Sequence, residues 1–384
     1  MMRPLSSTVK NMRRSGIREI MDLAQAMPEV VHLEVGEPGF LTPSHIVQAA
    51  HKAAEEGFTK YTPNAGLLSL REQIVSKLAA LNGLEVSVEN VVVTTGAVGA
   101  LATALMAILE PGEEVLIPDP AWPNFEMIII CSHGVPKFYP LSPENRFWPE
   151  IGVLEDLVTP RCKAMIMNSP SNPTGAVFPA EHVQALVDFA VRHDLYLIAD
   201  EVYEQLIFEA EHVSPGRLDD DGRVVGVHSF SKTYAMTGWR VGYAVASRSV
   251  AELIAKLQEP YFSCASSVSQ KAAEAALMGS QDCVVEMREE YQENRDLAAK
   301  LLKDAGLAFV KPQGTFYTMV DISAFGLDSY TFAKKLLQEQ AVAVAPGRTF
   351  GPSGDGYIRI SLAPTAVEIR EGLARLASFV HGLQ

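Results

Sequence analysis

The middle of the chain alternates short, nearly continuous apolar runs with longer amphipathic stretches, and this alternation restricts the fold more than any other feature. Apolar runs of this kind indicate strands buried on both faces. Strands separated by helices are typical of a mostly parallel sheet with helices on both sides. The predicted strands are 90–95, 114–118, 163–167, 196–199 and 224–230, and the predicted helices are 99–109, 180–193 and 250–257.

The pattern changes after about Ser280. A long charged helix is predicted over 282–305, followed by shorter strands at 316–320, 341–345 and 357–361 and a terminal helix from Ala366. A chain of 384 residues favours two domains. We therefore predict an α/β fold with a large domain (45–280) around a mostly parallel, helix-covered sheet, and a smaller α+β domain (1–44 and 281–384).

Composition narrows the classes of partner. The net charge of −14 disfavours nucleic acid and anionic membranes, because both require a basic surface. The basic N-terminus lacks the apolar core of a secretory signal, and the apolar run 125–131 is too short to span a bilayer. The four cysteines show neither metal-ligand spacing nor a dense disulfide pattern. These features predict a cytoplasmic protein with small-molecule partners and no metal.

In open α/β sheets the ligand lies beyond the carboxyl ends of the strands, and polar residues follow several of the predicted strands. Lys232 follows 224–230 and has Ser229, Ser231 and Arg240 nearby in sequence. Alone, Lys232 is most simply a surface charge. Together, these side chains can surround a phosphate and an aldehyde, because a buried lysine can form an imine and arginine suits phosphate.

Two further segments carry polar residues at strand ends. Asp200 ends the run YLIAD, where a buried carboxylate needs a positive partner such as a protonated pyridine nitrogen. Glu201 is interpreted as a cap. Tyr203 and Asn172 can each donate a hydrogen bond to a phenolic oxygen on the same ring, although the segment around Asn172 also reads as a plain turn.

The segment TTGAVGA, which includes Gly96, runs from a strand into a helix. It is neither a dinucleotide fingerprint nor a P-loop, but free backbone N–H groups at a helix N-terminus bind phosphate well. Trp122, in DPAWPNF, is either a structural anchor or a face that stacks on an electron-poor ring.

Taken together, eight segments resemble the class I/II aminotransferases of fold type I, which depend on pyridoxal 5′-phosphate. The resemblance covers nearly the whole chain in the same order. It implies an enzyme of amino acid metabolism that moves an amino group from an amino acid to a 2-oxo acid in two half-reactions, through a Schiff base (aldimine) on Lys232. The segments are LEVGEPGF, YTPNAG, TTGAVGA, DPAWPNF, NSPSNPTG, ADEVYE, SFSKTYAMTGWRVGY and GYIRIS.

The resemblance also implies a role for each matching residue. Lys232, Asp200 and Tyr203 are the catalytic residues, and Trp122 stacks on the ring. Arg359, with Asn172 and the backbone of Gly36, binds the substrate α-carboxylate. Tyr61 reaches the phosphate of a neighbouring subunit, so the active form is a homodimer. The implied cofactor-binding set is Tyr61, Gly96, Ala97, Val98, Trp122, Asn172, Asp200, Tyr203, Ser229, Lys232 and Arg240.

One departure from the family bears on the substrate. Ala97 and Val98 carry no hydroxyl, so phosphate binding there must rely on backbone N–H groups. Relatives that prefer aspartate carry a lysine near Val98 that binds the distal carboxylate, and valine cannot do this. The sequence therefore favours a neutral or aromatic amino donor over aspartate.

The sequence is also compatible, to different degrees, with other functions. A C–S lyase or a cyclopropane-amino-acid-type synthase would use nearly the same residues, and would be distinguished by its products. A non-catalytic effector-binding module usually carries an added DNA-binding domain, and no basic helix-turn-helix extension is visible. A nicotinamide-dependent dehydrogenase is disfavoured because the dinucleotide fingerprint is missing.

Overall fold

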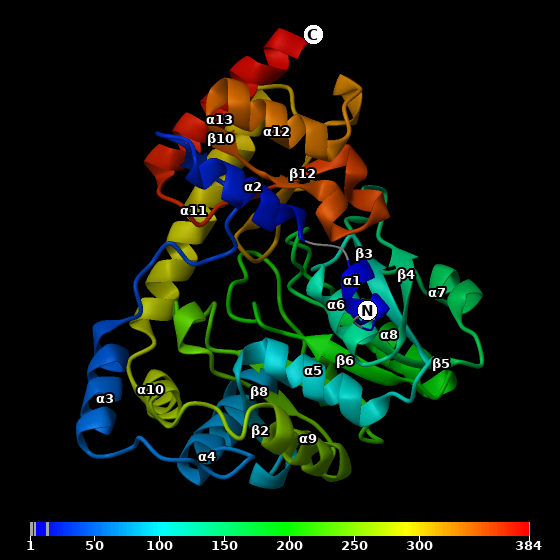
Figure 1. Ribbon diagram of the computed structural model, residues 1–384, viewed down its shortest axis with the longest axis vertical. Helices are drawn as coiled ribbons and strands as arrows, with labels where there is room; N and C mark the ends of the chain where they lie inside the picture. Colours follow the sequence, from blue (N-terminus) through cyan, green and yellow to red (C-terminus); the bar gives the residue numbers. More distant parts are fainter. Residues whose placement is uncertain (1–2, 4, 13–14, 384) are drawn as a thin grey trace.

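The computed structural model describes residue 3, residues 5–12 and residues 15–383, and is organised around a seven-stranded sheet that we call the main sheet (Figure 1). Its strand order is β2-β8-β7-β6-β5-β3-β4, and β8 is antiparallel to its neighbours while the others run in one direction. The strands are β2 (Val91–Thr94), β3 (Glu114–Asp119), β4 (Val135–Pro140), β5 (Cys162–Asn168), β6 (Tyr196–Asp200), β7 (Val224–Ser229) and β8 (Gly242–Val245).

Helices cover both faces of the main sheet, which explains why its inner strands are apolar on both sides. One face packs against α5 (Gly96–Ile108), α6 (Asn124–Cys131) and α9 (Arg248–Tyr261). The opposite face packs against α7 (Ile151–Leu157) and α8 (Ala180–Arg192), and towards the β2 edge against α3 (Ser44–Glu55), α4 (Leu68–Lys77) and α10 (Ser267–Met278). The carboxyl ends of the strands are left for a ligand.

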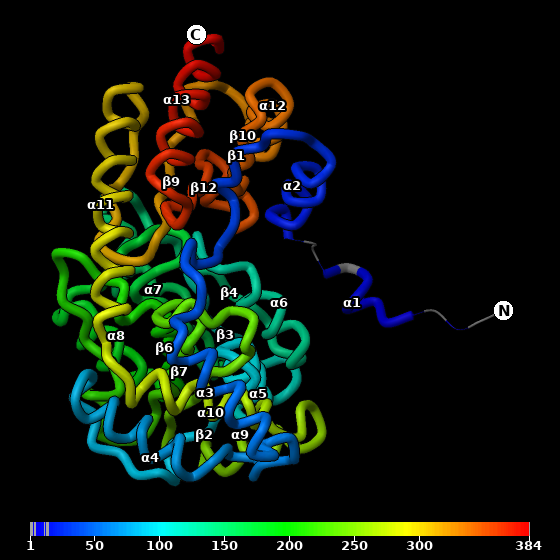
Figure 2. The backbone as a smooth tube through the Cα atoms, turned by 90° about the vertical axis from the view of Figure 1, so that its left-hand side faces the viewer, coloured from blue at the N-terminus to red at the C-terminus, as the bar shows by residue number. Residues whose placement is uncertain are grey.

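A second core surrounds a three-stranded antiparallel sheet, the small sheet, of order β11-β12-β9. Its strands are β9 (Tyr317–Asp321), β11 (Ala345–Pro346) and β12 (Tyr357–Ser361), and its helices are α11 (Asp282–Asp304), α12 (Ser329–Gln340) and α13 (Ala366–Leu383). The N-terminal segment contributes α2 (Gly16–Gln25) and β1 (Val31–His32), which pairs with β10 (Val342–Ala343), whereas α1 (Ser7–Asn11) lies against α6. Figure 2 shows α11 running along one side of the molecule past both sheets.

The predicted fold class is confirmed, with informative differences. The predicted strand 341–345 is two short strands, because β10 pairs with β1 whereas β11 pairs with β12. Strands β4 and β8 were not predicted, and the apolar run 125–131 lies in α6. The domain limits 45–280, 1–44 and 281–384 stay a prediction. Within the described residues, no helix is both long and apolar enough to cross a membrane.

Candidate active site

A cavity of about 550 Å³ opens at the carboxyl ends of the main-sheet strands and is closed on its other side by the small sheet and α2. Strand register explains why the polar residues meet there. Asn168 and Asp200 are paired across β5 and β6, and Ser229 is paired with Gly242 across β7 and β8. Side chains that follow these strands therefore gather at one edge of the sheet.

Lys232 lines this cavity as a half-buried cation. Its Nζ donates a hydrogen bond to the carbonyl oxygen of Gly36 at 2.6 Å, and no salt bridge joins it to any described carboxylate. Burial lowers the pKa of Lys232 to about 8; the nearby Glu37 opposes that shift, and the cations Arg359 and Arg240 add to it. About a tenth of the amine is therefore neutral at pH 7, far more than for an ordinary lysine, and the neutral form is the one that acts as a nucleophile or base.

Asp200 is the buried carboxyl group of this cavity. Its side chain is 3% exposed, and its Oδ1 accepts a hydrogen bond from the backbone N–H of Val202 at 3.2 Å. Burial raises the pKa of Asp200 to about 7, and no described lysine, arginine or histidine forms an ion pair with it. A carboxylate in this condition gains stability from any cation brought into the cavity.

Tyr203 is buried beside Asp200, and its hydroxyl meets that of Tyr317, the first residue of β9, at 3.0 Å. Burial is the main reason why the pKa of Tyr203 lies well above its ordinary value. The hydroxyl of Tyr203 is therefore protonated at neutral pH and can act as a hydrogen-bond donor into the cavity.

Arg359, on β12, is a buried cation held in place by polar groups rather than by a carboxylate. Its Nη1 donates to Oδ1 of Asn172 at 3.0 Å and its Nη2 to the carbonyl oxygen of Glu34 at 2.6 Å. The guanidinium lies 4.2 Å from the ring centroid of Tyr317, and its Nε has no partner among the described residues. Because Oδ1 of Asn172 accepts from Arg359, the amide NH₂ of Asn172 is left to donate to a ligand.

The opposite end of the cavity has the character of an anion site. Ala97 and Val98 lie in the first turn of α5, where backbone N–H groups are free, and Arg240 lies beside them. Gly96 has a φ of +69°, which favours glycine, and a Cβ there would lie 2.6 Å from Nη2 of Arg240 and push the guanidinium aside. Ser229 accepts a hydrogen bond from the N–H of Ser231 at 3.1 Å, which leaves its hydroxyl proton for a ligand.

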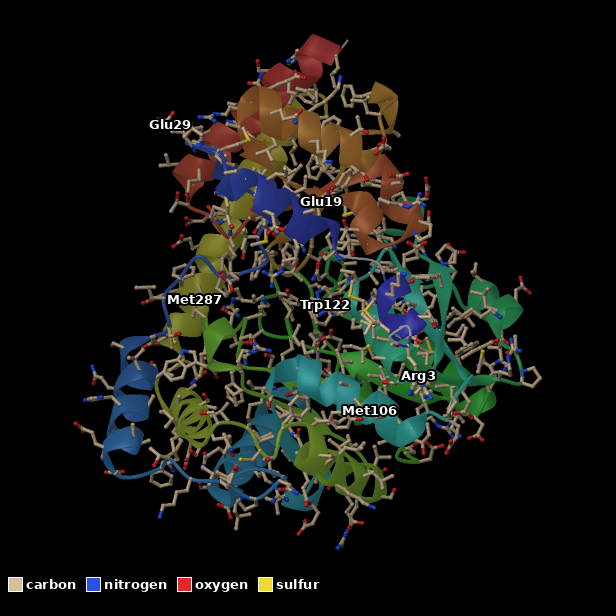
Figure 3. The ribbon with its side chains drawn as sticks, viewed as in Figure 1. Arg3, Glu19, Glu29, Met106, Trp122 and Met287 are labelled. Carbon is tan, nitrogen blue, oxygen red and sulfur yellow. The ribbon has the colours of Figure 1, made fainter. Side chains whose placement is uncertain are left out.

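Trp122 forms a wall of the cavity and packs edge-on against Phe125, with ring centroids 5.6 Å apart. Figure 3 shows Trp122 beneath helix α2, which carries the labelled Glu19. Every residue predicted for the site lines the cavity except Gly96, which lies behind Arg240, and Tyr61. Tyr61 is 88% exposed and lies outside the cavity of its own chain.

The sequence analysis missed several cavity residues. Tyr317 and Glu37 both lie in segments with a recognisable signal, since Tyr317 belongs to the predicted strand 316–320 and Glu37 belongs to LEVGEPGF. Ile17, Arg18 and Met21, on α2, carried no signal because their position depends on how the N-terminal segment packs. The interpretation of Glu201 as a cap was wrong: its buried carboxylate accepts from Ser214 at 3.0 Å and pairs with His212 at 2.7 Å.

The cavity fits pyridoxal 5′-phosphate from end to end. The first turn of α5 and Arg240 suit the phosphate, and Lys232 suits the aldehyde. Asp200 suits the ring nitrogen. The absence of a side chain at Gly96 leaves room for the Arg240 guanidinium beside the first turn of α5, so both groups can reach one phosphate.

Comparisons with known proteins agree with this geometry. Residues 28–376 match the family described as aminotransferase class I and II. An aspartate aminotransferase of Pyrococcus abyssi is 41% identical over 94% of each chain, and an aromatic-amino-acid aminotransferase of Thermococcus litoralis is 38% identical over 97% of each chain. The solved structure of Thermus thermophilus aspartate aminotransferase with maleate covers 98% of this chain and 100% of its own, with 38% identity and a TM-score of 0.94. The chain therefore belongs to the class I and II aminotransferases, enzymes that depend on pyridoxal 5′-phosphate.

Proposed function

We propose that the cavity binds pyridoxal 5′-phosphate and exchanges amino groups between a neutral or aromatic amino acid and a 2-oxo acid. The observation that carries this proposal is the set of unpaired buried charges, because Lys232, Asp200 and Arg359 share one cavity and none has a counterion among the described residues. Buried charges are costly unless they are paired, so this arrangement indicates groups that wait for a ligand.

The bound cofactor supplies an aldehyde carbon and an electron-withdrawing ring. Asp200 would hold the ring nitrogen in its protonated form, while Asn172 and Tyr203 would donate hydrogen bonds to the phenolic oxygen. The N–H groups of Ala97 and Val98, with Ser229 and Arg240, hold the phosphate, and Trp122 packs against the ring. The family resemblance implies these assignments, and every residue named in them lines the cavity.

Lys232 and Arg359 act on the substrate. Arg359 binds the α-carboxylate through the N–H groups of Nη1 and Nη2 that its bonds to Asn172 and Glu34 leave free, assisted by Asn172 and the backbone of Gly36. The amine Nζ of Lys232 would take the proton from the substrate Cα and return it to the cofactor carbon derived from the aldehyde. Its lowered pKa makes the base form available near neutral pH.

A neutral or aromatic donor is supported by the apolar residues that line the cavity, which include Val98, Trp122, Ile17 and Met21. A dicarboxylic substrate is the second candidate, because Arg18 also lines the cavity and makes no salt bridge with a described carboxylate. In an enzyme with two half-reactions, the donor and the acceptor occupy the same cavity in turn, so both features can serve one reaction.

We also propose a cytoplasmic homodimer in which Tyr61 reaches the partner's cavity, supported by the exposure of Tyr61 and by four cysteines without disulfides. Mixing Tyr61→Phe subunits with Lys232→Ala subunits tests this arrangement. A hybrid dimer retains one cavity with both residues intact, so activity should rise above that of either parent. No gain in a confirmed hybrid would exclude the shared site.

The absorbance spectrum of the purified protein tests the central proposal. A visible band that borohydride fixes on Lys232 is expected, and each productive amino donor should convert it to a near-ultraviolet band while a 2-oxo acid is released. Release of ammonia with pyruvate would identify a lyase instead. Absence of any cofactor band after addition of pyridoxal phosphate would refute the proposal.

A further inference from the structure

The hydroxyl pair Tyr203–Tyr317 joins the two sheets at the centre of the cavity. Tyr203 follows β6 of the main sheet, and Tyr317 begins β9 of the small sheet. Their hydroxyl oxygens are 3.0 Å apart, and both side chains are almost completely buried. Among the described residues, this is the one hydrogen bond made by either hydroxyl.

Proton counting determines the direction of this hydrogen bond when the cofactor is bound. A tyrosine hydroxyl has a single proton to donate. If Tyr203 donates that proton to the phenolic oxygen of the cofactor, it can meet Tyr317 only as an acceptor. Tyr317 must then be the donor of the pair. Its hydroxyl is also a cavity-lining group, so the bond lies beside the cofactor.

The surroundings favour Tyr317 as a donor. The guanidinium of Arg359 lies 4.2 Å from its ring centroid, and a cation at this distance makes a phenol proton more acidic. Burial raises the pKa of both tyrosines, so both hydroxyls are protonated at neutral pH. The other charged groups that act on the pair are Asp200, on Tyr203, and Glu37, on Tyr317, while Nζ of Lys232 lies 5.9 Å from the ring centroid of Tyr203.

The backbone is shaped to admit the Tyr317 hydroxyl. A Cβ on Gly36 would lie 2.7 Å from this oxygen, which is too close for contact. The carbonyl oxygen of the same Gly36 accepts the hydrogen bond from Lys232. Because Gly36 has no side chain, the Tyr317 hydroxyl and the Lys232 amine can both lie next to its backbone on one wall of the cavity.

We propose that Tyr317 is a positioning residue that donates its hydroxyl proton to Tyr203 and thereby directs the Tyr203 proton onto the phenolic oxygen of the cofactor. This inference rests on the proposed function, because it requires Tyr203 to face that oxygen. Accepting a hydrogen bond also makes Tyr203 a stronger donor, since hydrogen bonds in a chain polarise one another. Tyr317 of the small sheet thus sets the direction in which Tyr203, on the main-sheet side of the cavity, donates its hydroxyl proton.

The test is a spectrophotometric pH titration of the holoenzyme in the wild type, Tyr317→Phe, Tyr203→Phe and the double variant. A donor at the phenolic oxygen draws electron density from it, so the bound cofactor loses its proton at lower pH. We expect Tyr203→Phe to raise the midpoint of the absorbance change, and Tyr317→Phe to raise it by about half a pH unit, which is less than Tyr203→Phe does. In the Tyr203→Phe background, the second substitution should add nothing.

Tyr291→Phe is the matched control, because Tyr291 is a buried tyrosine of the same core that does not line the cavity. Its midpoint should equal that of the wild type. Gly36→Ala is the second variant, since its methyl group would displace the Tyr317 hydroxyl and should shift the midpoint in the same direction.

An unchanged midpoint in Tyr317→Phe, or a shift that persists unchanged in the Tyr203→Phe background, would overturn the inference. The proposed function fails differently: no visible cofactor band would form in the wild type, and Tyr203→Phe would leave the midpoint of any band in place.

Discussion

Two buried polar clusters lie on opposite sides of the chain at the end of β6. Residues that are adjacent in sequence belong to different clusters. The open cluster contains Asn172, Asp200, Tyr203, Lys232 and Arg359 and lines the cavity. The closed cluster contains Lys77, Asn82, Glu201, Glu204, His212 and His228. Consecutive side chains of an extended chain point in opposite directions, so Asp200 and Glu201 enter different clusters.

The closed cluster satisfies its own charges. The carboxylate of Glu204 pairs with Lys77 and accepts from Nδ2 of Asn82 at 2.7 Å, and that of Glu201 pairs with His212. Although burial opposes it, the attraction of Lys77 holds the pKa of Glu204 well below its ordinary value. Glu201, Glu204 and His212 bring three metal-capable atoms within 4.8 Å of one another, yet each carboxylate already has a partner in the protein.

The open cluster leaves its charges unmatched, and this difference separates function from structure. Asp200 has a pKa raised to about 7 and Lys232 a pKa lowered to about 8, because burial penalises both charged forms. Both clusters contain a buried lysine and a buried carboxylate. Composition and burial are therefore alike, and only the absence of pairing among the described residues marks the site that takes a ligand.

Replacement of the two buried lysines gives the largest contrast. Lys232→Ala should reduce kcat by about 10⁴-fold or more, because it removes both the point of cofactor attachment and the base at Cα. Its thermal unfolding without cofactor should be unchanged or improved, since a desolvated cation is lost. Steady-state kinetics and calorimetry on one preparation check both effects. A variant that keeps a tenth of the activity would contradict the assignment of Lys232.

Lys77→Met should give the reverse pattern. Removing Lys77 leaves Glu204 buried without its cation, which should lower the free energy of unfolding by about 3 kcal/mol. The value of kcat at a temperature where the variant is folded should stay within about twofold of the wild type, because Lys77 does not line the cavity. Urea unfolding and initial rates measure the two quantities. An activity loss that exceeds the loss of folded protein would show that the closed cluster also contributes to catalysis, which contradicts the prediction.

Arg359→Lys tests whether the cation of the open cluster works through its shape as well as its charge. Lysine keeps the charge but cannot bind a carboxylate in a bidentate manner while also contacting Asn172. We expect kcat/KM to fall about 10²-fold, which corresponds to roughly 2–3 kcal/mol. The control is a primary amine that lacks a carboxylate. Its slow reaction should be equal in both enzymes, and an equal loss for both substrates would assign Arg359 to the fold rather than to the substrate.

The difference between the clusters also explains what the sequence could predict. Lys232, Asp200, Asn172 and Trp122 all follow strongly apolar strands, so the rule that ligands bind at carboxyl ends placed them correctly near one cavity. Tyr317 could not be placed in this way, because its position depends on how the small sheet packs against the main sheet. Packing of this kind leaves no periodic signal in the sequence.

The closed cluster was invisible for a related reason. Glu204 meets Lys77 across 127 residues of chain and Asn82 across 122, and such pairings depend on the tertiary structure. From the sequence alone, Asp200 is assigned to the ligand side of the sheet and Glu201 to a cap, and nothing there indicates that Glu201 enters a second buried cluster. The side of the strand on which a carboxylate finds its cation separates them, and that information belongs to the fold.

The smallest expected effect is on the free energy of unfolding, which should change in opposite directions when each of two buried carboxylates is replaced by its amide. The folded protein without cofactor holds a proton on Asp200 up to about pH 7, whereas an unfolded aspartate loses it near pH 4. The free energy of unfolding therefore falls as pH rises through this window, and Asp200→Asn should be more stable than the wild type at pH 8, on the order of 2 kcal/mol.

Glu204→Gln should be less stable than the wild type at the same pH, because the lowered pKa of Glu204 means that its ionised form stabilises the fold above the pKa of an unfolded glutamate. Urea unfolding of the cofactor-free proteins at pH 5 and pH 8 measures both. The gain from Asp200→Asn should shrink at pH 5, where Asp200 is already protonated in the folded state. If the two substitutions changed stability in the same direction at pH 8, the distinction between an unmatched and a matched buried charge would be wrong.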